Sequence, residues 1–497
     1  MNAALAVVSP VASNIGEAQA ALEKKGSPAH PEDPAPEVSR WLPVALSSAL
    51  FMDLLDTSAL GSALPTLARE FAADPLHLKL ALTAYLLTMA IFVPMSGWLA
   101  DRYGARRVFV NAMKVYLIGS VCCGLSSSVP ELVAARVLQG LGGAMMTPVA
   151  RLIVVASTPR ERLVQALNAF TIPAVIGPLL GPPIAGLLLD VASWRWIFFV
   201  NLPVGLAGMW AVLRLVPRLR HPHPGRFDAF GFVLAGIAIT AFVTLAEMVG
   251  TQVVSWRVQV AVALTAIAGF AIYALHARRA AAPMLELKLL ATPTYRASLV
   301  GSTIVRLGLG ATPFLVPLQL QLGLGWSALK SGTVMIAMIV GSIVARFVGT
   351  WAVRHLGFRA TLIATGIATG VTTAAPSLFH ADTPALVVAG VLAAMGFARA
   401  TFFVAASALT FADVSADQVS RASTLSTVVQ QLGLSLGVSV AGAALAWSKA
   451  TASALTLDSF VAPFVVFGIA ALATVPTFAR LGPNVAEQMR GRRHGPQ

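Results

Sequence analysis

Runs of about 20 apolar residues recur along the chain from residue 41 onward, separated by short polar stretches. A helix of that length crosses a hydrocarbon layer about 30 Å thick, so each run is a candidate transmembrane helix. Only 11% of the residues are charged, against about 25% in typical soluble domains. The sequence therefore predicts an all-α integral membrane protein. Fourteen such runs occur, at residues 42–63, 78–99, 108–127, 132–151, 166–188, 196–216, 229–249, 257–276, 297–321, 332–353, 360–378, 383–408, 423–446 and 459–479.

The basic residues indicate how these helices are oriented. The net charge is +14, but Lys and Arg lie in short clusters between apolar runs and not on one soluble face, so we expect no nucleic-acid partner. With a cytoplasmic N-terminus, Lys and Arg are roughly four times as frequent on the inner side as on the outer side, as the positive-inside rule requires. We therefore expect a proline-rich disordered cytoplasmic tail at residues 1–40 and a second cytoplasmic tail at residues 481–497.

One stretch of sequence occurs twice. Residues 97–107 (GWLADRYGARR), after the second run, resemble residues 349–359 (GTWAVRHLGFR), after the tenth. Repeated halves are typical of secondary transporters. The repeat predicts an N-terminal six-helix half at residues 41–216, an inserted helix pair with flanking cytoplasmic loops at residues 217–296, and a C-terminal six-helix half at residues 297–480.

Four further stretches join the 97–107 segment, and all five occur in the order found in one protein family. They are Leu55-Asp56-Thr57 leading to Ala63-Leu64-Pro65, Arg136-Val137-Leu138-Gln139-Gly140, Gly177-Pro178-Leu179-Leu180-Gly181, and Ser193-Trp194-Arg195-Trp196 leading to Asn201-Leu202-Pro203. Together they resemble the major facilitator superfamily, and within it the fourteen-helix drug:proton antiporter branch of the EmrB/QacA type.

The resemblance implies a major facilitator fold with two inserted helices. It also implies a multi-pass protein of the bacterial inner membrane that exports small molecules, in particular drugs, in exchange for protons by alternating access. Its partners would be the small-molecule substrate, protons and the lipid bilayer, with a periplasmic adaptor protein as a candidate by family analogy. No cofactor is expected, because neither a nucleotide-binding domain nor a buried metal motif is found.

Three charged residues inside the first and fourth runs are the candidate coupling site. Asp53 and Asp56 lie three residues apart on nearly one face of a helix, where an ionised carboxylate is expensive and therefore suggests a function. The resemblance assigns Asp56 to proton or substrate coupling, and Arg136 to tuning that carboxylate. For all three the alternative is a structural ion pair that holds helices together.

Two motifs carry structural expectations. Gly177, Pro178, Gly181 and Pro182 are expected to break the fifth helix, since proline removes backbone donors, and the resemblance associates this bend with antiporters. The inner-loop signature, which is expected to latch neighbouring helix ends or simply to be a solvated loop, comprises Gly97, Asp101, Arg102, Gly104, Arg106 and Arg107.

Three arginines within the C-terminal runs leave the substrate open. Arg306, Arg346 and Arg399 could place positive charge in the central cavity, which would favour an organic anion or a metal chelate over a cationic drug. A membrane-embedded enzyme lacks a credible nucleophile, base or metal set in this sequence. A transport-dead sensor would need a sizeable soluble output domain, which the polar segments are too short to provide.

Overall fold

The structure is a computed structural model that describes residues 41–158, 162–216, 227–248, 254–415, 418–449 and 455–482. The predicted tail 1–40 and residues 483–497 of the predicted tail 481–497 lie outside the described residues. Within the described ranges every regular element is a helix, so the prediction of an all-α protein is confirmed.

The elements follow the predicted runs closely. Thirteen helices of the described chain are long and apolar enough to cross a membrane. The remaining predicted run, 360–378, corresponds to the 17-residue helix α14 and the short turn η4 that continues it. The elements are α2 (Leu42–Glu70), α3 (Pro75–Phe92), α4 (Met95–Tyr103), α5 (Ala105–Leu125), α6 (Val129–Ser157), α7 (Leu163–Val191), α8 (Trp196–Phe199), α9 (Asn201–Leu215), α10 (Ala229–Met248), α11 (Trp256–Arg279), η2 (Leu287–Ala291), α12 (Pro293–Leu318), η3 (Gln319–Gly323), α13 (Ala328–Leu356), α14 (Phe358–Ala374), η4 (Ala375–Leu378), α15 (Ala385–Phe411), α16 (Val419–Lys449), η6 (Leu457–Phe460), α17 (Val461–Leu472) and α18 (Val475–Ala479).

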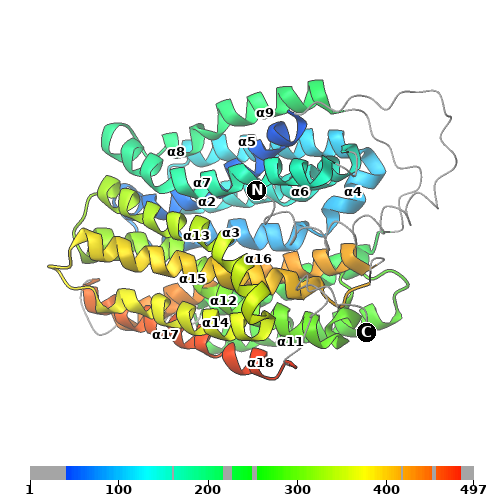
Figure 1. Cartoon of the computed structure of the whole chain (residues 1–497). Coiled ribbons are helices and arrows are strands. Elements are labelled where there is room, and N and C mark those ends of the chain that lie inside the picture. Colours follow the sequence, from blue (N-terminus) through cyan, green and yellow to red (C-terminus); the bar gives the residue numbers. More distant parts are fainter. Residues whose placement is uncertain are drawn as a thin grey trace.

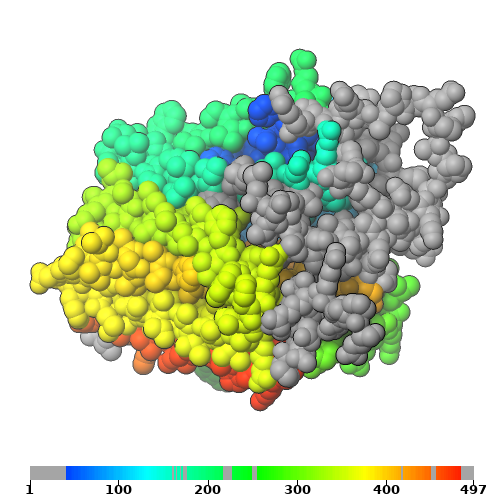
Figure 2. All heavy atoms as spheres, viewed as in Figure 1, coloured from blue at the N-terminus to red at the C-terminus, as the bar shows by residue number. Residues whose placement is uncertain are grey.

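The helices form two groups that lie side by side (Figure 1). In the first, α2 packs on α7, and α6 packs on both α3 and α5. In the second, α12 packs on α16, and α15 packs on both α13 and α14. The space-filling view shows the first group, blue to green, above the second, yellow to red, on the face drawn (Figure 2).

The two groups meet along two pairs of helices, α7 with α13 and α3 with α16, and α2 also touches α12 between them. Glycines allow these helices to approach closely at the end of the bundle that carries the α2–α3 turn. A Cβ atom added at Gly186 would lie 2.6 Å from Cα of Leu329, and one at Gly332 would lie 2.6 Å from the carbonyl carbon of Pro182. This end of the bundle is therefore closed.

Helices α10 and α11, which correspond to the predicted inserted pair, pack against each other. α10 also lies against α3 and α16, so it covers one of the two lines along which the halves meet. The inserted pair thus touches both halves.

The prediction that the Gly-Pro pairs break the fifth helix is wrong. α7 is helical without interruption from Leu163 to Val191, through Pro178 and Pro182. Each proline removes a single donor, and a wider break would leave unpaired backbone groups in an apolar layer. The glycines instead serve packing on α2, because a Cβ at Gly177 would lie 2.8 Å from the carbonyl oxygen of Phe51.

The predicted inner loop is also mostly helical, which corrects the sequence interpretation. Gly97, Asp101 and Arg102 lie in α4, and only Gly104 forms the turn into α5. Gly104 has φ +88° and Gly357, between α13 and α14, has φ +84°, a conformation that favours glycine. The repeated sequence therefore corresponds to a repeated helix–glycine–helix junction.

Candidate functional site

Arg136 and Asp56 form a buried ion pair between α6 and α2. Both residues are 0% exposed, and Nη1 of Arg136 donates to Oδ2 of Asp56. The same nitrogen donates to Oε1 of Gln139 at 2.6 Å, and Nε of Arg136 donates to the carbonyl oxygen of Ala81 at 3.3 Å. A buried arginine needs such acceptors, since it cannot usefully lose its proton. The pair predicted from two separate runs is thus brought together.

Side-chain amides complete the surroundings of Asp56. Its Oδ1 accepts from Nε2 of Gln139 and from Nδ2 of Asn201, each at 3.2 Å. Ser120 joins the network, since its hydroxyl accepts from Asn201 at 3.0 Å and donates to the carbonyl oxygen of Phe198 at 2.9 Å. One hydrogen-bond network around Asp56 therefore joins five helices, α2, α5, α6, α8 and α9.

Asp53 lies one turn away and has a different partner. The phenol of Tyr85 on α3 donates to Oδ1 of Asp53 at 2.5 Å. The Tyr85 ring also lies beneath the guanidinium group of Arg136, whose central carbon is 4.5 Å from the ring centroid. Asp53 is 9% exposed, so it is the more accessible of the two carboxylates.

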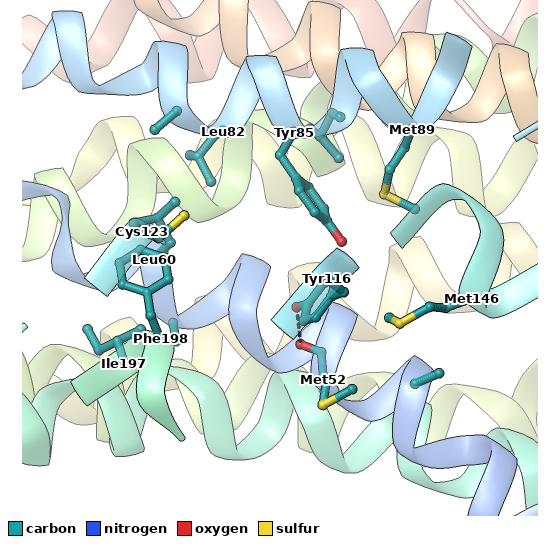
Figure 3. Packing of buried hydrophobic residues seen from close by; sticks show 14 of the residues in the cluster. Met52, Leu60, Leu82, Tyr85, Met89, Tyr116, Cys123, Met146, Ile197 and Phe198 are labelled. Carbon is teal, nitrogen blue, oxygen red and sulfur yellow. Dashed lines mark hydrogen bonds between the residues drawn. The ribbon is translucent and has the colours of Figure 1, made fainter. Parts of the chain in front are cut away.

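Aromatic and sulfur side chains enclose these polar groups. Figure 3 shows Tyr85 reaching toward Tyr116, whose hydroxyl donates to the carbonyl oxygen of Met52 at 3.3 Å. Met146 from α6 and Phe198 from α8 are buried in the same cluster. The low-polarity lining strengthens the charge interactions of the Asp56–Arg136 pair.

The three candidate cavity arginines are not brought together with this pair. Arg399 on α15 is buried, and it donates to the hydroxyls of Thr312 at 2.8 Å and Thr373 at 3.4 Å. Arg306 on α12 is half-buried, and its guanidinium carbon lies 4.5 Å from the ring centroid of Phe403. Arg346 is exposed on α13.

The inner signature residues lie at the opposite end of the bundle from the α2–α3 turn. Arg106 donates to the carbonyl oxygen of Leu213 at 2.5 Å, which ties α5 to α9. Arg102 lies over the rings of Trp98 and Tyr103. Arg107 lines an apolar cavity of about 360 Å³ between α4, α5 and α6. These side chains serve helix contacts within the N-terminal half.

A second buried ion pair was missed by the sequence analysis. Nζ of Lys79 on α3 lies 2.9 Å from Oε2 of Glu247 on α10, and the two side chains are 6% and 11% exposed. Oε1 of Glu247 also accepts from Thr83 at 2.8 Å and from Ser439 on α16 at 2.6 Å. The only sequence signal was one charge near the end of each of two apolar runs, which also fits side chains that reach the membrane surface.

The acidic residues of the site do not belong to a metal-binding cluster of the described residues. Across the described ranges no group of three or more His, Cys, Asp or Glu side chains could hold a metal ion. The two carboxylates lie one turn apart, and one is paired with arginine while the other is paired with a phenol.

The sequence matches the model of one protein family, the Major Facilitator Superfamily, over residues 46–293 and 298–495. The chain is also 38% identical over 413 residues to MdtD of Escherichia coli strain SE11, a protein named for multidrug resistance, and this match covers 82% of the chain and 86% of MdtD. MdtD of Shigella flexneri matches with the same identity and coverage.

Two solved structures share the fold at low sequence identity. One is a bacterial homolog of the human lysosomal transporter Spinster, in an inward-facing and unoccupied conformation, with a TM-score of 0.62, 15% identity and coverage of 92% of this chain and 97% of that one. The other is a point mutant of the nucleoside transporter NupG, with a TM-score of 0.63, 13% identity and coverage of 88% of this chain and 99% of that one.

Proposed function

We propose that this chain, which belongs to the Major Facilitator Superfamily, is a proton-coupled exporter of drug-like small molecules of the fourteen-helix EmrB/QacA branch. Membership itself makes it a multi-pass membrane transporter and not an enzyme. Family membership alone does not establish proton coupling, drug export or the fourteen-helix branch. The likeness to MdtD supports drug export.

The observation that carries the proposal is the buried pair of Asp56 and Arg136, with Asp53 one turn away. An ionisable group within a membrane protein is by default a functional candidate, because its burial costs free energy that packing alone would not require. Tyr85 contacts both charges, since it donates to Asp53 and its ring faces Arg136. A proton that arrives at Asp53 therefore changes the surroundings of the Asp56–Arg136 pair.

Coupling follows from the connections of this pair. Protonation of Asp56 would remove the charge that holds Arg136 and weaken the contacts that join α2 to α6 and α9. A change in the packing of α2 would also change the interface between the halves, because α2 contacts α12. One proton moved inward releases about 2.3 kcal/mol per 100 mV, enough to sustain a substrate gradient of roughly fifty-fold at that potential.

Alternating access is supported by the closed end of the bundle. With both termini in the cytoplasm, this closed end would face outward. We propose that orientation in the bacterial inner membrane from the distribution of basic residues. Reporter fusions to the two termini would test it, since an external location for either end contradicts it. Whether a periplasmic adaptor takes part can be tested by co-purification.

A second candidate function is export of an organic anion or a metal chelate by the same mechanism. It is favoured by Arg306 and Arg399, for which the described residues provide no acidic partner.

The proposal is tested by replacing Asp56 with Asn. The expected result is loss of proton-coupled export with insertion retained, because an amide cannot bind and release a proton near neutral pH. Export would be followed in inverted vesicles energised with an inward proton gradient, as fluorescence that reports proton release when a candidate compound is added. The variant Asp56→Glu should retain part of the coupling, since it keeps a carboxylate.

Asp190→Asn is the matched control, because Asp190 is an exposed acid at the end of α7. It should export like the wild type. Arg136→Ala should impair coupling more than it lowers the amount of inserted protein. Uphill export by Asp56→Asn with an unchanged dependence on the proton gradient would make Asp56 a structural residue and refute the mechanism.

A further inference from the structure

A charged group without an acidic partner lies between α12 and α15. Arg399 is 4% exposed, and its two terminal nitrogens donate only to the hydroxyls of Thr312 and Thr373. Its Nε has no hydrogen-bond partner in the described structure. No acidic side chain of the described chain forms an ion pair with it. Among the described residues, the guanidinium group therefore contacts only neutral oxygen atoms.

The N-terminal half shows what this position lacks. The spacing that separates the turn glycines Gly104 and Gly357 also separates Ser120 on α5 from Thr373 on α14. Ser120 belongs to the network around Asp56 and Arg136, and Thr373 contacts Arg399. The C-terminal network thus also contains an arginine and hydroxyls, but its partner on α12 is the threonine Thr312, whereas α2 supplies the aspartate Asp56 to Arg136.

The missing charge is costly in this setting. Arginine remains protonated, and an unpaired ion inside a protein costs several kcal/mol. The hydroxyl of Thr312 offers Arg399 only a dipole, since its own hydrogen is donated to the carbonyl oxygen of Gly308 at 2.7 Å. A bound anion would supply the negative charge that the described residues do not place beside Arg399.

A second guanidinium group lies along the same helix pair. Arg306 stands over Phe403, which is four residues from Arg399 and shares its face of α15. Arg306 is half-buried and has no acidic partner among the described residues. A Cβ atom added at Gly308 would lie 3.7 Å from its nearest neighbour and 4.0 Å from a terminal nitrogen of Arg399. These are ordinary contact distances, so the buried backbone beside Arg399 has room for a methyl group without displacement of its neighbours.

We propose that the α12–α15 seam, defined by Arg306, Thr312, Thr373 and Arg399, is a binding site for a monovalent anion. Arg399 and the two hydroxyls hold the anion, and the half-buried Arg306 receives it first. Two sources share this chemistry, the carboxylate of a transported solute and free chloride. The first would deepen the proposed function by making the substrate an organic acid, and it rests on that function; the second does not.

Binding can be measured on the purified full-length protein as the midpoint temperature of thermal unfolding. Sodium chloride or sodium benzoate would be titrated at constant ionic strength against sodium HEPES, whose anion is bulky and polar. We expect a saturable rise in the midpoint with one of the two probes. A response to chloride identifies the inorganic anion, and a response to benzoate alone identifies a carboxylate of the solute.

Variants locate the response. Arg346→Gln is the matched control, since Arg346 is exposed on α13, and it should respond like the wild type. Arg399→Gln should lose the response, and Arg306→Gln should weaken it at least several-fold in apparent affinity. Thr312→Asp supplies a carboxylate beside Arg399 and should abolish the response in a protein that still folds, which covers the case in which Arg399→Gln does not.

No response of the wild type to either probe would overturn the proposal, and so would an unchanged response in both Arg399→Gln and Thr312→Asp. Anion binding itself does not require proton-coupled export. Asp56→Asn should keep the anion response even though it loses export, so failure of one proposal can be told from failure of the other.

Discussion

The hydroxyl of Ser439 is the contact through which the C-terminal half reaches Glu247. Ser439 on α16 donates to Glu247 at 2.6 Å, while Lys79 and Thr83 bind the same carboxylate from α3 of the other half. Opening the end of the bundle near the α2–α3 turn must separate α3 from α16. Ser439→Ala should therefore favour the open state, because it removes a contact that exists only while this end is closed.

The size of the effect follows from the kind of bond. A hydrogen bond to a charged group contributes about 1.5–3 kcal/mol, which corresponds to a change of roughly 10- to 150-fold in the equilibrium between closed and open states. Thr83→Val is the control. It removes one bond from Glu247 within the contact to α3 but keeps the Lys79 ion pair, so its effect on the equilibrium should be much smaller.

The equilibrium can be read from the distance between spin labels at positions 77 and 447, since His77 and Trp447 are exposed near this end of α3 and α16. Cys122 and Cys123 would first be replaced by serine. The expected result is a larger long-distance population in Ser439→Ala than in Thr83→Val. Equal distance distributions in Ser439→Ala and the unmutated label pair would refute the view that Glu247 links the two halves.

Three further predictions follow from single contacts. Gly332→Val should shift the same spin-label distances toward the open state, because its Cβ would collide with the backbone of Pro182, whereas Gly390→Val, with open space around it, should not. Lys79→Ala should lower thermal stability by about 3–5 kcal/mol by leaving Glu247 unpaired, and the double variant Lys79→Ala/Glu247→Ala should recover part of that loss in a double-mutant cycle. Burial alone would raise the pKa of Asp228, but the backbone amides of Gly231 and Met284 and the His276 ring donate to its carboxylate and hold the pKa below the usual 3.8. Because a lowered pKa stabilises the fold above the unfolded value, this contribution should be full at neutral pH and fade as the pH falls below about 4, so Asp228→Asn should lower the midpoint of thermal unfolding more at pH 7 than at pH 3.

The fold was predictable because each transmembrane helix is determined by the residues of its own segment. Each helix must satisfy its own backbone in an apolar layer, so a run of apolar residues is itself the signal for a span. The Asp56–Arg136 pair could be predicted for a related reason, since a charged residue in the middle of an apolar run needs a partner. The sequence could not show that Gln139, Asn201 and Ser120 complete this pair, because polar uncharged residues at mid-helix are common and their partners come from distant segments.

The errors have physical causes as well. Proline predicts an interruption of the fifth helix, but α7 lies between α2 and α13, and close packing at its glycines keeps it helical past Pro178 and Pro182. The stretch 97–107 resembles a loop in sequence because charges replace apolar residues there. A helix that leaves the apolar layer can continue with charged residues, and α4 ends only at Gly104, whose positive φ stops it.

The two halves differ most in how they compensate buried charge, and this difference bears on direction of coupling. In the N-terminal half Arg136 has its acid within the protein, so only a proton can change the balance there. In the C-terminal half Arg399 has no such acid among the described residues, so an arriving anion could change the balance. If both changes act through the contact of α2 with α12, a proton and an anion would bias the same rearrangement from opposite sides of one interface. Linkage then requires that the apparent affinity for the anion depend on the protonation of Asp56. The anion titration should therefore yield different affinities at two pH values in the wild type and one shared affinity in Asp56→Asn; a pH-independent affinity in the wild type would show that the two sites are not coupled.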